Sequence, residues 1–340
     1  MVISLDPSMF KEKEREFLLS PTFSVSLFQY RSGVEAARIK AGRGEFVWLP
    51  YLGQQIWDWN IDGISQKFDG FVKEPAYGRN FLQNYGGFLI HCGMTAMGNP
   101  GEGDTHPQHG ELPLARFDEA WIEVTEENGS QALRLKGRRH WHVPFVSEYH
   151  CITGLRIPAN GLSMDADLLL ENPTAQAMEY MYLAHINFPF KGAERILSTA
   201  TFDQAHVRIR NETIAGLSAL PEVIKSIGQA DIYDPELVAI VSDMDALGGN
   251  IGSALVCTDG TIRWVCQEGP SLDHHVVWIT HNEDRGACGF HLPSTDGPDG
   301  YRSEKARGTV KQLPARGSVT MKYSCGYGDS QAAVPFIGAT

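Results

Sequence analysis

The sequence predicts an all-β protein, a large antiparallel β-sandwich with few short helices. Runs of alternating apolar and polar residues recur along most of the 340 residues, as half-buried strands require. The pairs Asn128-Gly129, Asn160-Gly161 and Asp259-Gly260 each separate two such runs, which is typical of tight hairpin turns. No G-x-G-x-x-G motif follows a predicted strand, and this argues against a doubly wound nucleotide-binding sheet.

Residues 1–22 are expected to form a helical or extended appendage. Within them, residues 8–19 suggest one short helix that is capped by Ser8 and ended by Pro21. Residues 23–330 are expected to form a single β-sandwich domain, because no linker rich in Pro, Gly and Ser separates blocks of different composition. Residues 331–340 are expected to be a C-terminal tail.

The predicted strands follow this appendage in order. The early ones cover residues 37–40, 46–50 and 55–63, and the third closes on the tight-turn pair Asp62-Gly63. Residues 69–105 are rich in glycine and are predicted to be mostly loop. Residues 234–247, which open with Asp234-Pro235-Glu236, suggest a helix. The later predicted strands cover residues 120–124, 131–136, 154–158, 162–168, 178–188, 254–257, 262–265, 274–279 and 318–323.

Composition excludes several classes of function. The formal net charge of -12 argues against a nucleic-acid partner, since phosphate binding needs a basic surface. No run of about 18 apolar residues predicts a membrane span, and the first residues lack the pattern of a signal peptide. The six scattered cysteines are therefore expected to be reduced, mostly buried thiols in a cytoplasmic protein. A homodimer is compatible with the sequence, which does not specify the oligomeric state.

Residues 104–111 form the densest cluster of side chains that can carry chemistry. The stretch holds two histidines, two carboxylates and a glutamine, while Pro107 and Gly110 predict a fixed loop. Histidine exchanges protons near neutral pH. We interpret His109 as a group that donates a proton or a hydrogen bond to a ligand oxygen, and His106 as its neighbouring partner. The remaining predicted substrate-binding residues of this loop are Gln108 and Glu111.

A metal site is an alternative for the histidines. His140 and His142 share one face of a predicted strand, and with His106, His109 and Glu111 they could bind zinc, iron or manganese. Their spacing matches no closed metal-binding motif.

Several short motifs follow one another along the chain in a characteristic order. They are the hairpin at residues 52–63, Gly86-Gly87-Phe88-Leu89 with Cys92-Gly93, His106-Pro107-Gln108-His109-Gly110, and Glu171-Asn172-Pro173-Thr174 followed by His185-Ile186-Asn187-Phe188. The chain therefore resembles the galactose mutarotase-like superfamily, in particular its aldose 1-epimerase-related branch formerly of unknown function, and the resemblance extends over roughly residues 37–325.

This resemblance implies a supersandwich with a sugar-binding cleft on one sheet. It implies an aldose 1-epimerase-like isomerase that acts on a sugar or sugar acid by acid–base catalysis without a cofactor. His185 resembles the strand histidine that acts as the acid, and His109 the loop histidine that binds the sugar. Asn187 lies two residues after His185 and should share its strand face. Arg79 is a candidate partner for an anionic sugar.

One departure from the family pattern concerns the catalytic base. The family's glutamate lies in a late G-[I/L]-E-P strand, which here reads Gly289-Phe290-His291-Leu292-Pro293. The substitution makes His291 the candidate base. It also leaves open two other functions on the same fold. One is a sugar lyase or isomerase whose divalent metal is held by His106, His109, His185 and His291; the other is a non-catalytic carbohydrate-binding protein.

Overall fold

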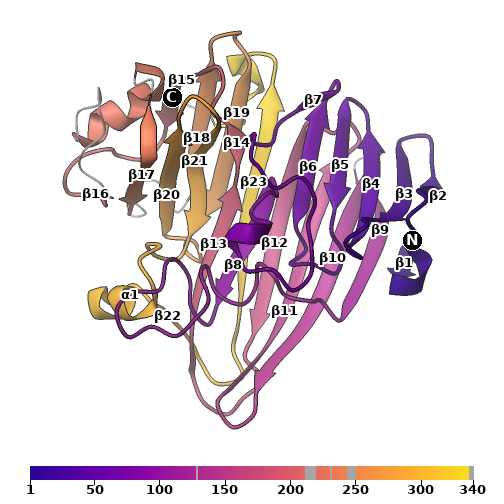
Figure 1. Cartoon of the computed structure of the whole chain (residues 1–340), viewed down its shortest axis with the longest axis horizontal. Coiled ribbons are helices and arrows are strands. Elements are labelled where there is room, and N and C mark those ends of the chain that lie inside the picture. Colours follow the sequence, from indigo (N-terminus) through magenta and orange to yellow (C-terminus); the bar gives the residue numbers. More distant parts are fainter. Residues whose placement is uncertain (128, 211–219, 230–231, 243–249, 337–340) are drawn as a thin grey trace.

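A computed structural model of the chain describes residues 1–127, 129–210, 220–229, 232–242 and 250–336. Within these residues two large antiparallel sheets pack face to face, and this confirms the predicted β-sandwich (Figure 1). The nine-stranded sheet lies behind the fourteen-stranded sheet in the view of Figure 1.

The nine-stranded sheet contains the three predicted Asn-Gly and Asp-Gly hairpins. Gly129, Gly161 and Gly260 have positive φ angles, which the tight turns require, whereas Asn128 lies outside the described residues. In spatial order the described strands are β1 (Val2–Leu5), β9 (Glu119–Glu127), β10 (Ser130–Val143), β11 (Ser147–Pro158), β12 (Ser163–Glu171), β23 (Ser318–Gly328), β19 (Ile262–Glu268), β18 (Asn250–Cys257) and β15 (Ala193–Ser198).

The fourteen-stranded sheet provides the surface on which the candidate site lies. Its described strands are, in spatial order, β16 (Val207–Ile209), β17 (Tyr233–Val241), β20 (His274–His281), β21 (Gly286–Ser294), β13 (Met178–Ile186), β8 (Leu89–Met94), β6 (Ile56–Ile61), β5 (Gly44–Trp48), β4 (Glu35–Ala41), β3 (Phe23–Gln29) and β2 (Arg15–Leu19). Three short strands pair beside this path: β14 (Phe188–Pro189) with β21, β22 (Lys311–Leu313) with β13, and β7 (Ile64–Ser65) with β6.

Helices contribute little to the described part of the chain. One α-helix, α1, spans Tyr301–Arg307, and short 3-10 segments cover Pro7–Met9, Leu82–Asn84, Pro221–Gln229 and Gln331–Ala333.

The predicted helix over residues 8–19 is wrong. Arg15–Leu19 form β2, which pairs with β3 at the edge of the fourteen-stranded sheet, while β1 pairs with β9 at the edge of the other sheet. Phe17 and Leu18 pack against the core from this edge. Pairing with an existing strand satisfies the backbone and buries these apolar side chains, which an isolated short helix does not achieve. Residues 1–22 therefore contribute an edge strand to each sheet.

The predicted helix over residues 234–247 is also wrong where the structure describes it. Tyr233–Val241 form β17, which lies between β16 and β20. Residues 237–241 are all buried, and a short, fully buried apolar run does not distinguish a strand from a helix by its periodicity. Residues 243–249 lie outside the described part of the chain.

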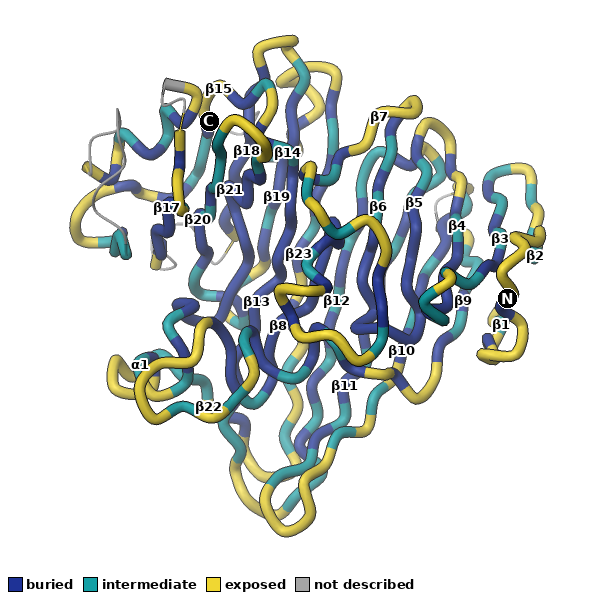
Figure 2. Tube along the Cα trace, in the orientation of Figure 1, coloured by how far each residue is buried: buried dark blue, intermediate teal, exposed yellow. Residues whose placement is uncertain are grey.

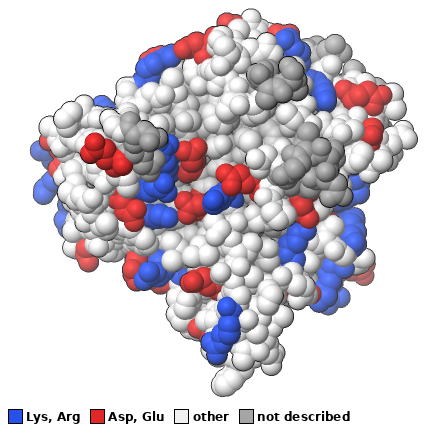
Figure 3. Space-filling view, turned by 180° about the vertical axis from the view of Figure 1, so that it is seen from behind, with Lys and Arg blue, Asp and Glu red and all other residues white. Residues whose placement is uncertain are grey.

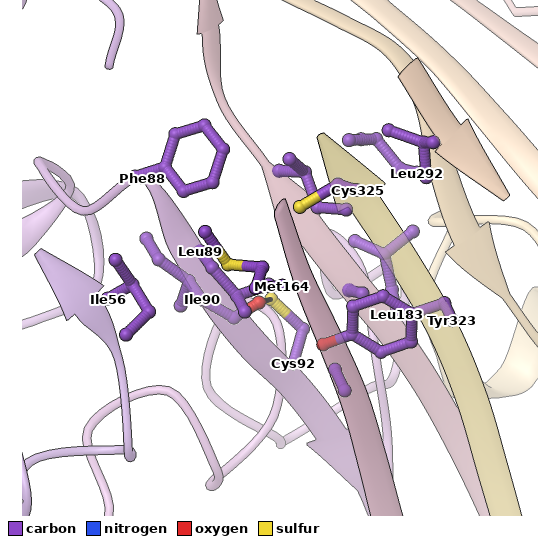
Figure 4. Close-up of a cluster of buried hydrophobic side chains, with 14 of the residues drawn as sticks. Ile56, Phe88, Leu89, Ile90, Cys92, Met164, Leu183, Leu292, Tyr323 and Cys325 are labelled. Atoms are coloured by element: carbon purple, nitrogen blue, oxygen red, sulfur yellow. Dashed lines mark hydrogen bonds between the residues drawn. The ribbon is translucent and has the colours of Figure 1, made fainter. Parts of the chain in front are cut away.

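The core fills the space between the two sheets. Leu89 of the fourteen-stranded sheet and Met164, Tyr323 and Cys325 of the nine-stranded sheet belong to this buried cluster (Figure 4). Figure 2 shows the burial continuing along the strands, with exposed residues concentrated in the connecting loops. All six cysteines lie in the described residues and are free, and five of them are buried, as predicted.

No helix in the described residues has both the length and the hydrophobicity that a membrane span requires.

Candidate functional site

A cleft of about 160 Å³ lies on the face of the fourteen-stranded sheet that points away from the core. Tyr182 of β13 faces the core, where its hydroxyl lies 3.2 Å from that of Tyr323 in the opposite sheet. Because side chains alternate along a strand, Leu183 and His185 face the cleft. The polar side chains that line it are Asn99, Gln108, His109, His185, Arg210 and Glu236; the aromatic ones include Phe81, Tyr85 and Trp278.

His185 is held in one orientation by Asn187 and Tyr85. The Nδ1 of His185 lies 2.7 Å from the Oδ1 of Asn187, and the Tyr85 hydroxyl donates to the same oxygen at 2.6 Å. The Nδ2 of Asn187 donates to the carbonyl of Gly87 at 2.9 Å, which orients the amide. Since an amide oxygen only accepts, Nδ1 of His185 carries a proton and Nε2 of the neutral ring is an acceptor.

Burial determines the charge of His185. The ring is 5% exposed, and desolvation lowers its pKa to about 4 although the hydrogen bond to Asn187 acts in the opposite direction. His185 is therefore a neutral imidazole at neutral pH.

His109 enters the cleft from the loop that follows β8. Its φ of 60° lies in the left-handed region, which is uncommon for residues other than glycine. The backbone N–H of His109 donates to Gly98 and its carbonyl accepts from Gly93, so the loop holds this conformation at both groups. Its ring lies 4.6 Å from Phe81 and 5.5 Å from His185 between centroids.

The Nδ1 atom of His109 is a buried polar atom that makes no hydrogen bond to any described residue. Burial lowers the pKa of His109 well below 6.5, and the neighbouring His185 and Arg210 lower it further. A neutral ring that lines a cleft and has a nitrogen without a partner in the described chain can form a hydrogen bond with a ligand once that nitrogen turns toward the cleft.

Glu111 does not line the cleft, in contrast to its predicted substrate-binding role. Its carboxylate accepts from the backbone N–H groups of Met94 and Thr95 at 3.1 Å, from the Thr95 hydroxyl at 2.8 Å and from the Tyr149 hydroxyl at 2.9 Å. These bonds attach the end of the loop to β8. Glu111 thereby helps to hold the loop that carries His109.

The other predicted binding residues divide between the cleft and its surroundings. Gln108 lines the cleft, and its amide donates to Asn99 at 2.7 Å. His106 is not a lining residue; its Nε2 lies 3.5 Å from Asp104 and accepts from the Tyr301 backbone N–H at 3.4 Å, so it ties the loop to α1. Arg79 is exposed, donates to the carbonyl of Glu74 and lies outside the lining.

Among the cleft residues that were not predicted from the sequence, Arg210, Glu236 and Trp278 form one connected group. Arg210 pairs with Glu236 at 2.5 Å, and the indole N–H of Trp278 donates to the other Glu236 oxygen at 2.7 Å. The Trp278 ring also contacts His185, with 5.1 Å between centroids. Trp278 therefore touches both the histidine and the carboxylate. Reading residues 234–241 as a strand would have placed Glu236 and Val238 on one face.

His291 does not line the cleft, in contrast to its predicted role as the base. It is 1% exposed and points into the core, where Nδ1 lies 2.8 Å from Ser253 and Nε2 lies 2.9 Å from Gln267 of the opposite sheet. The next residue, Leu292, lines the cleft, because neighbouring residues on a strand face opposite sides. The alternative metal set that includes His291 is therefore not assembled.

Comparisons with known proteins place this geometry among related folds. A sequence model described as "Domain of unknown function (DUF4432)" matches residues 31–326. No curated protein matches the chain.

Among solved structures, a Klebsiella pneumoniae protein named "putative aldose 1-epimerase" has a TM-score of 0.81 at 16% identity, covering 96% of this chain and 90% of that one. A galactose mutarotase-like protein from Clostridium acetobutylicum has a TM-score of 0.64 at 13% identity, with 91% and 99% covered. Galactose 1-epimerase from Lactobacillus acidophilus has a TM-score of 0.56 at 12% identity, with 92% and 100% covered. At these identities the likeness is one of fold, and it confirms the mutarotase-like sandwich.

Proposed function

Since the chain belongs to the family DUF4432, a domain of unknown function, and has a mutarotase-like fold, we propose that its cleft binds one sugar or sugar acid and interconverts its anomers. The observation that carries this proposal is that His109, whose buried Nδ1 makes no hydrogen bond within the described chain, lines the same cleft as the oriented His185. Proteins rarely leave such an atom without a partner, so a ligand oxygen is its natural acceptor or donor.

The lining suits a compact polyol. The cleft is smaller than the roughly 300–1,000 Å³ of sites for drug-sized ligands, so a single sugar ring is a reasonable occupant. The aromatic faces of Trp278 and Phe81 can pack on the C–H groups of the ring, while Gln108 and His109 can bind its hydroxyls. Arg210, a cation in the lining, allows an acidic sugar as well as a neutral one.

We assign the proton transfers to Glu236 and His185. The Glu236 carboxylate takes the proton of the anomeric hydroxyl, and His185 Nε2 gives a proton to the ring oxygen. The bond between C1 and the ring oxygen breaks and leaves an open-chain aldehyde. Rotation about the C1–C2 bond and the reverse transfers close the ring on the other face. Each proton returns to its starting group, so the sequence needs no added reactant.

In this assignment Glu236 replaces His291 as the base. Glu236 is the carboxylate among the described lining residues of the cleft, and Trp278 holds it on the side of His185. His185 must gain a proton at Nε2 before it can act as the acid, because burial keeps it neutral at pH 7.

Exchange of the anomers, followed by NMR saturation transfer on a panel of aldoses and uronic acids, tests the proposal. We expect exchange faster than in buffer for at least one sugar, and its loss in His185→Asn and Glu236→Gln. Arg79→Ala is a matched control, because Arg79 is an exposed cation outside the cleft.

A non-catalytic carbohydrate-binding protein is the second candidate. It is favoured by Leu292, which supplies an apolar side chain to the cleft on the strand where the family pattern has its glutamate. Saturable binding of a sugar without exchange above the spontaneous rate is the result that would select this candidate.

A further inference from the structure

Three adjacent strands bring histidines and carboxylates together on the outer face of the nine-stranded sheet. In the register of β10, β11 and β12, His140 lies opposite His150, His142 opposite Glu148, and His150 opposite Glu171. Directly paired residues of an antiparallel sheet point to the same face with their Cβ atoms about 4.5–5.5 Å apart. These five side chains therefore form one continuous patch, near the hairpin that projects at the bottom of Figure 1.

The distances within this patch suit a shared ion. The Nε2 of His140 lies 2.7 Å from the Oε1 of Glu148, and the Nε2 of His150 lies 4.0 Å from the same oxygen. One ligand atom from each of these three residues lies within 4.8 Å of those from the other two. Protein ligands lie about 2.0–2.2 Å from a zinc ion, so small rotations of exposed side chains are enough to close the site.

The rest of this face has a different chemistry. Farther along the same strands, Lys136 pairs with Asp167 at 3.1 Å and Arg156 pairs with Asp165 at 2.9 Å. Figure 3 shows such positive and negative side chains mixed across the back of the molecule. In the patch, the carboxylates lie beside imidazoles and not beside ammonium or guanidinium groups. Imidazole with carboxylate is a ligand set for divalent transition metals, whereas ammonium and guanidinium groups are not ligands.

Solvent and further ligands can reach the patch. His140, His142 and Glu148 line a surface groove of about 1220 Å³ that runs past the hairpin. The second imidazole, His142, lies 5.2 Å from His140 between ring centroids, and Nδ1 of His150 lies 3.9 Å from Glu171. An ion held by three protein groups would thus keep positions open for water or for one of these neighbours.

We propose that His140, Glu148 and His150 form a binding site for a divalent transition-metal ion of the zinc class, with His142 and Glu171 as neighbouring groups. The ion takes the place of the hydrogen bond between His140 and Glu148, and it links β10 to β11 close to their hairpin. The site lies on the other sheet from the sugar cleft, and its existence does not depend on the proposed isomerase activity.

The test is titration of the full chain, prepared without a polyhistidine tag and stripped with a chelator, with Zn²⁺ alone in a calorimeter. We expect one ion per chain, and a loss of affinity of at least about tenfold in His140→Ala, His150→Ala and Glu148→Gln. His206→Ala is the matched control, since His206 is a partly exposed histidine that also contacts a carboxylate, that of Asp203 at 2.7 Å. It should bind Zn²⁺ as the unchanged protein does.

A second readout separates the site from general effects on folding. Co²⁺ in place of Zn²⁺ should give visible absorption bands that disappear in the three patch variants, while their thermal unfolding without metal stays like that of the unchanged protein. Lack of stoichiometric binding, equal binding in the patch variants, or an equal loss in His206→Ala would each overturn the proposal.

Discussion

The Nδ1 of His185 donates to the Oδ1 of Asn187 over 2.7 Å, and this bond determines which nitrogen of the ring is available for chemistry. The Oδ1 of Asn187 points toward His185 because the Nδ2 of the same amide donates to the Gly87 carbonyl. The two residues lie two positions apart at the end of one strand, so their relative placement is a property of the local backbone.

Replacing Asn187 with Leu should slow anomer exchange by about 10- to 100-fold, since the His185 ring loses the acceptor that orients it. Unfolding in urea should also show a loss of about 1–3 kcal/mol, because buried donors remain without a partner. Tyr85→Phe, which removes the other donor to Asn187 but keeps the bond between Asn187 and His185, should slow exchange less than Asn187→Leu does. An equal loss of exchange in both variants would contradict the orienting role of Asn187.

Glu236→Gln should reduce anomer exchange by about 10²–10⁴-fold, the usual effect of losing a general base. The amide keeps the size of the carboxylate and can still accept from Trp278. Sugar binding, measured by line broadening in NMR, should persist. Exchange at the unchanged rate would assign the base to another group.

His291→Ala should act on stability and not on exchange. The side chain fills the core and binds Ser253 and Gln267, so its removal should cost about 2–5 kcal/mol of unfolding free energy. Exchange per folded molecule should remain as in the unchanged protein, because Leu292 and not His291 faces the cleft. Loss of exchange in a folded His291→Ala protein would restore His291 as the base.

The stability of the protein should fall as the pH falls below 6.5. Burial lowers the pKa of His91 and of His185 to about 4 in the folded state, against an ordinary value of 6.5. Between these values the unfolded chain binds protons that the folded chain excludes, so acid favours unfolding. Protonation of each of the two residues should lower the free energy of unfolding by about 3 kcal/mol by the time the pH reaches the pKa of that residue in the folded state.

Urea unfolding at pH values of about 7.5, 5.5 and 4.5 measures this effect. His91→Gln should flatten the dependence, since it removes one of the groups concerned. An unfolding free energy that stays constant from pH 7.5 to 4.5 would contradict the assignment of neutral buried imidazoles.

The rate of exchange should also depend on pH if His185 is the acid. The imidazolium needed for proton donation is a small fraction at pH 7, and it grows as the pH falls toward about 4. We therefore expect the initial rate to rise between pH 7.5 and 5.5, measured before acid unfolding begins. A rate that rises with pH instead would make His185 the base.

Local sequence patterns were sufficient to predict most of the fold. Asn160-Gly161 and Asp259-Gly260 form the expected turns, since only a few residue types adopt the positive φ that these hairpins need. The helix expected over residues 8–19 failed for a different reason. Its charged and apolar residues are compatible with a helix and with a strand. Pairing with β3, which is a tertiary contact, favours the strand.

The candidate site was predictable only in part. His185 with Asn187, and His109 in its loop, follow from short motifs and from the period of a strand. Glu236 was missed because its segment was interpreted as a helix. Arg210 was missed because only the pairing of β16 with β17 brings it next to Glu236. The position of His291 depends on a choice between two faces of one strand, which a run of buried residues on both faces does not reveal.

Anomer exchange in the unchanged protein and in His185→Asn, followed by NMR saturation transfer on the sugar that binds best, tests the central claim most directly. We predict exchange well above the spontaneous rate for the unchanged protein. For the variant we predict a loss of about 10²–10⁴-fold, with the sugar still bound. Equal exchange in the two proteins, or exchange in neither despite saturable binding, would contradict the proposed isomerase.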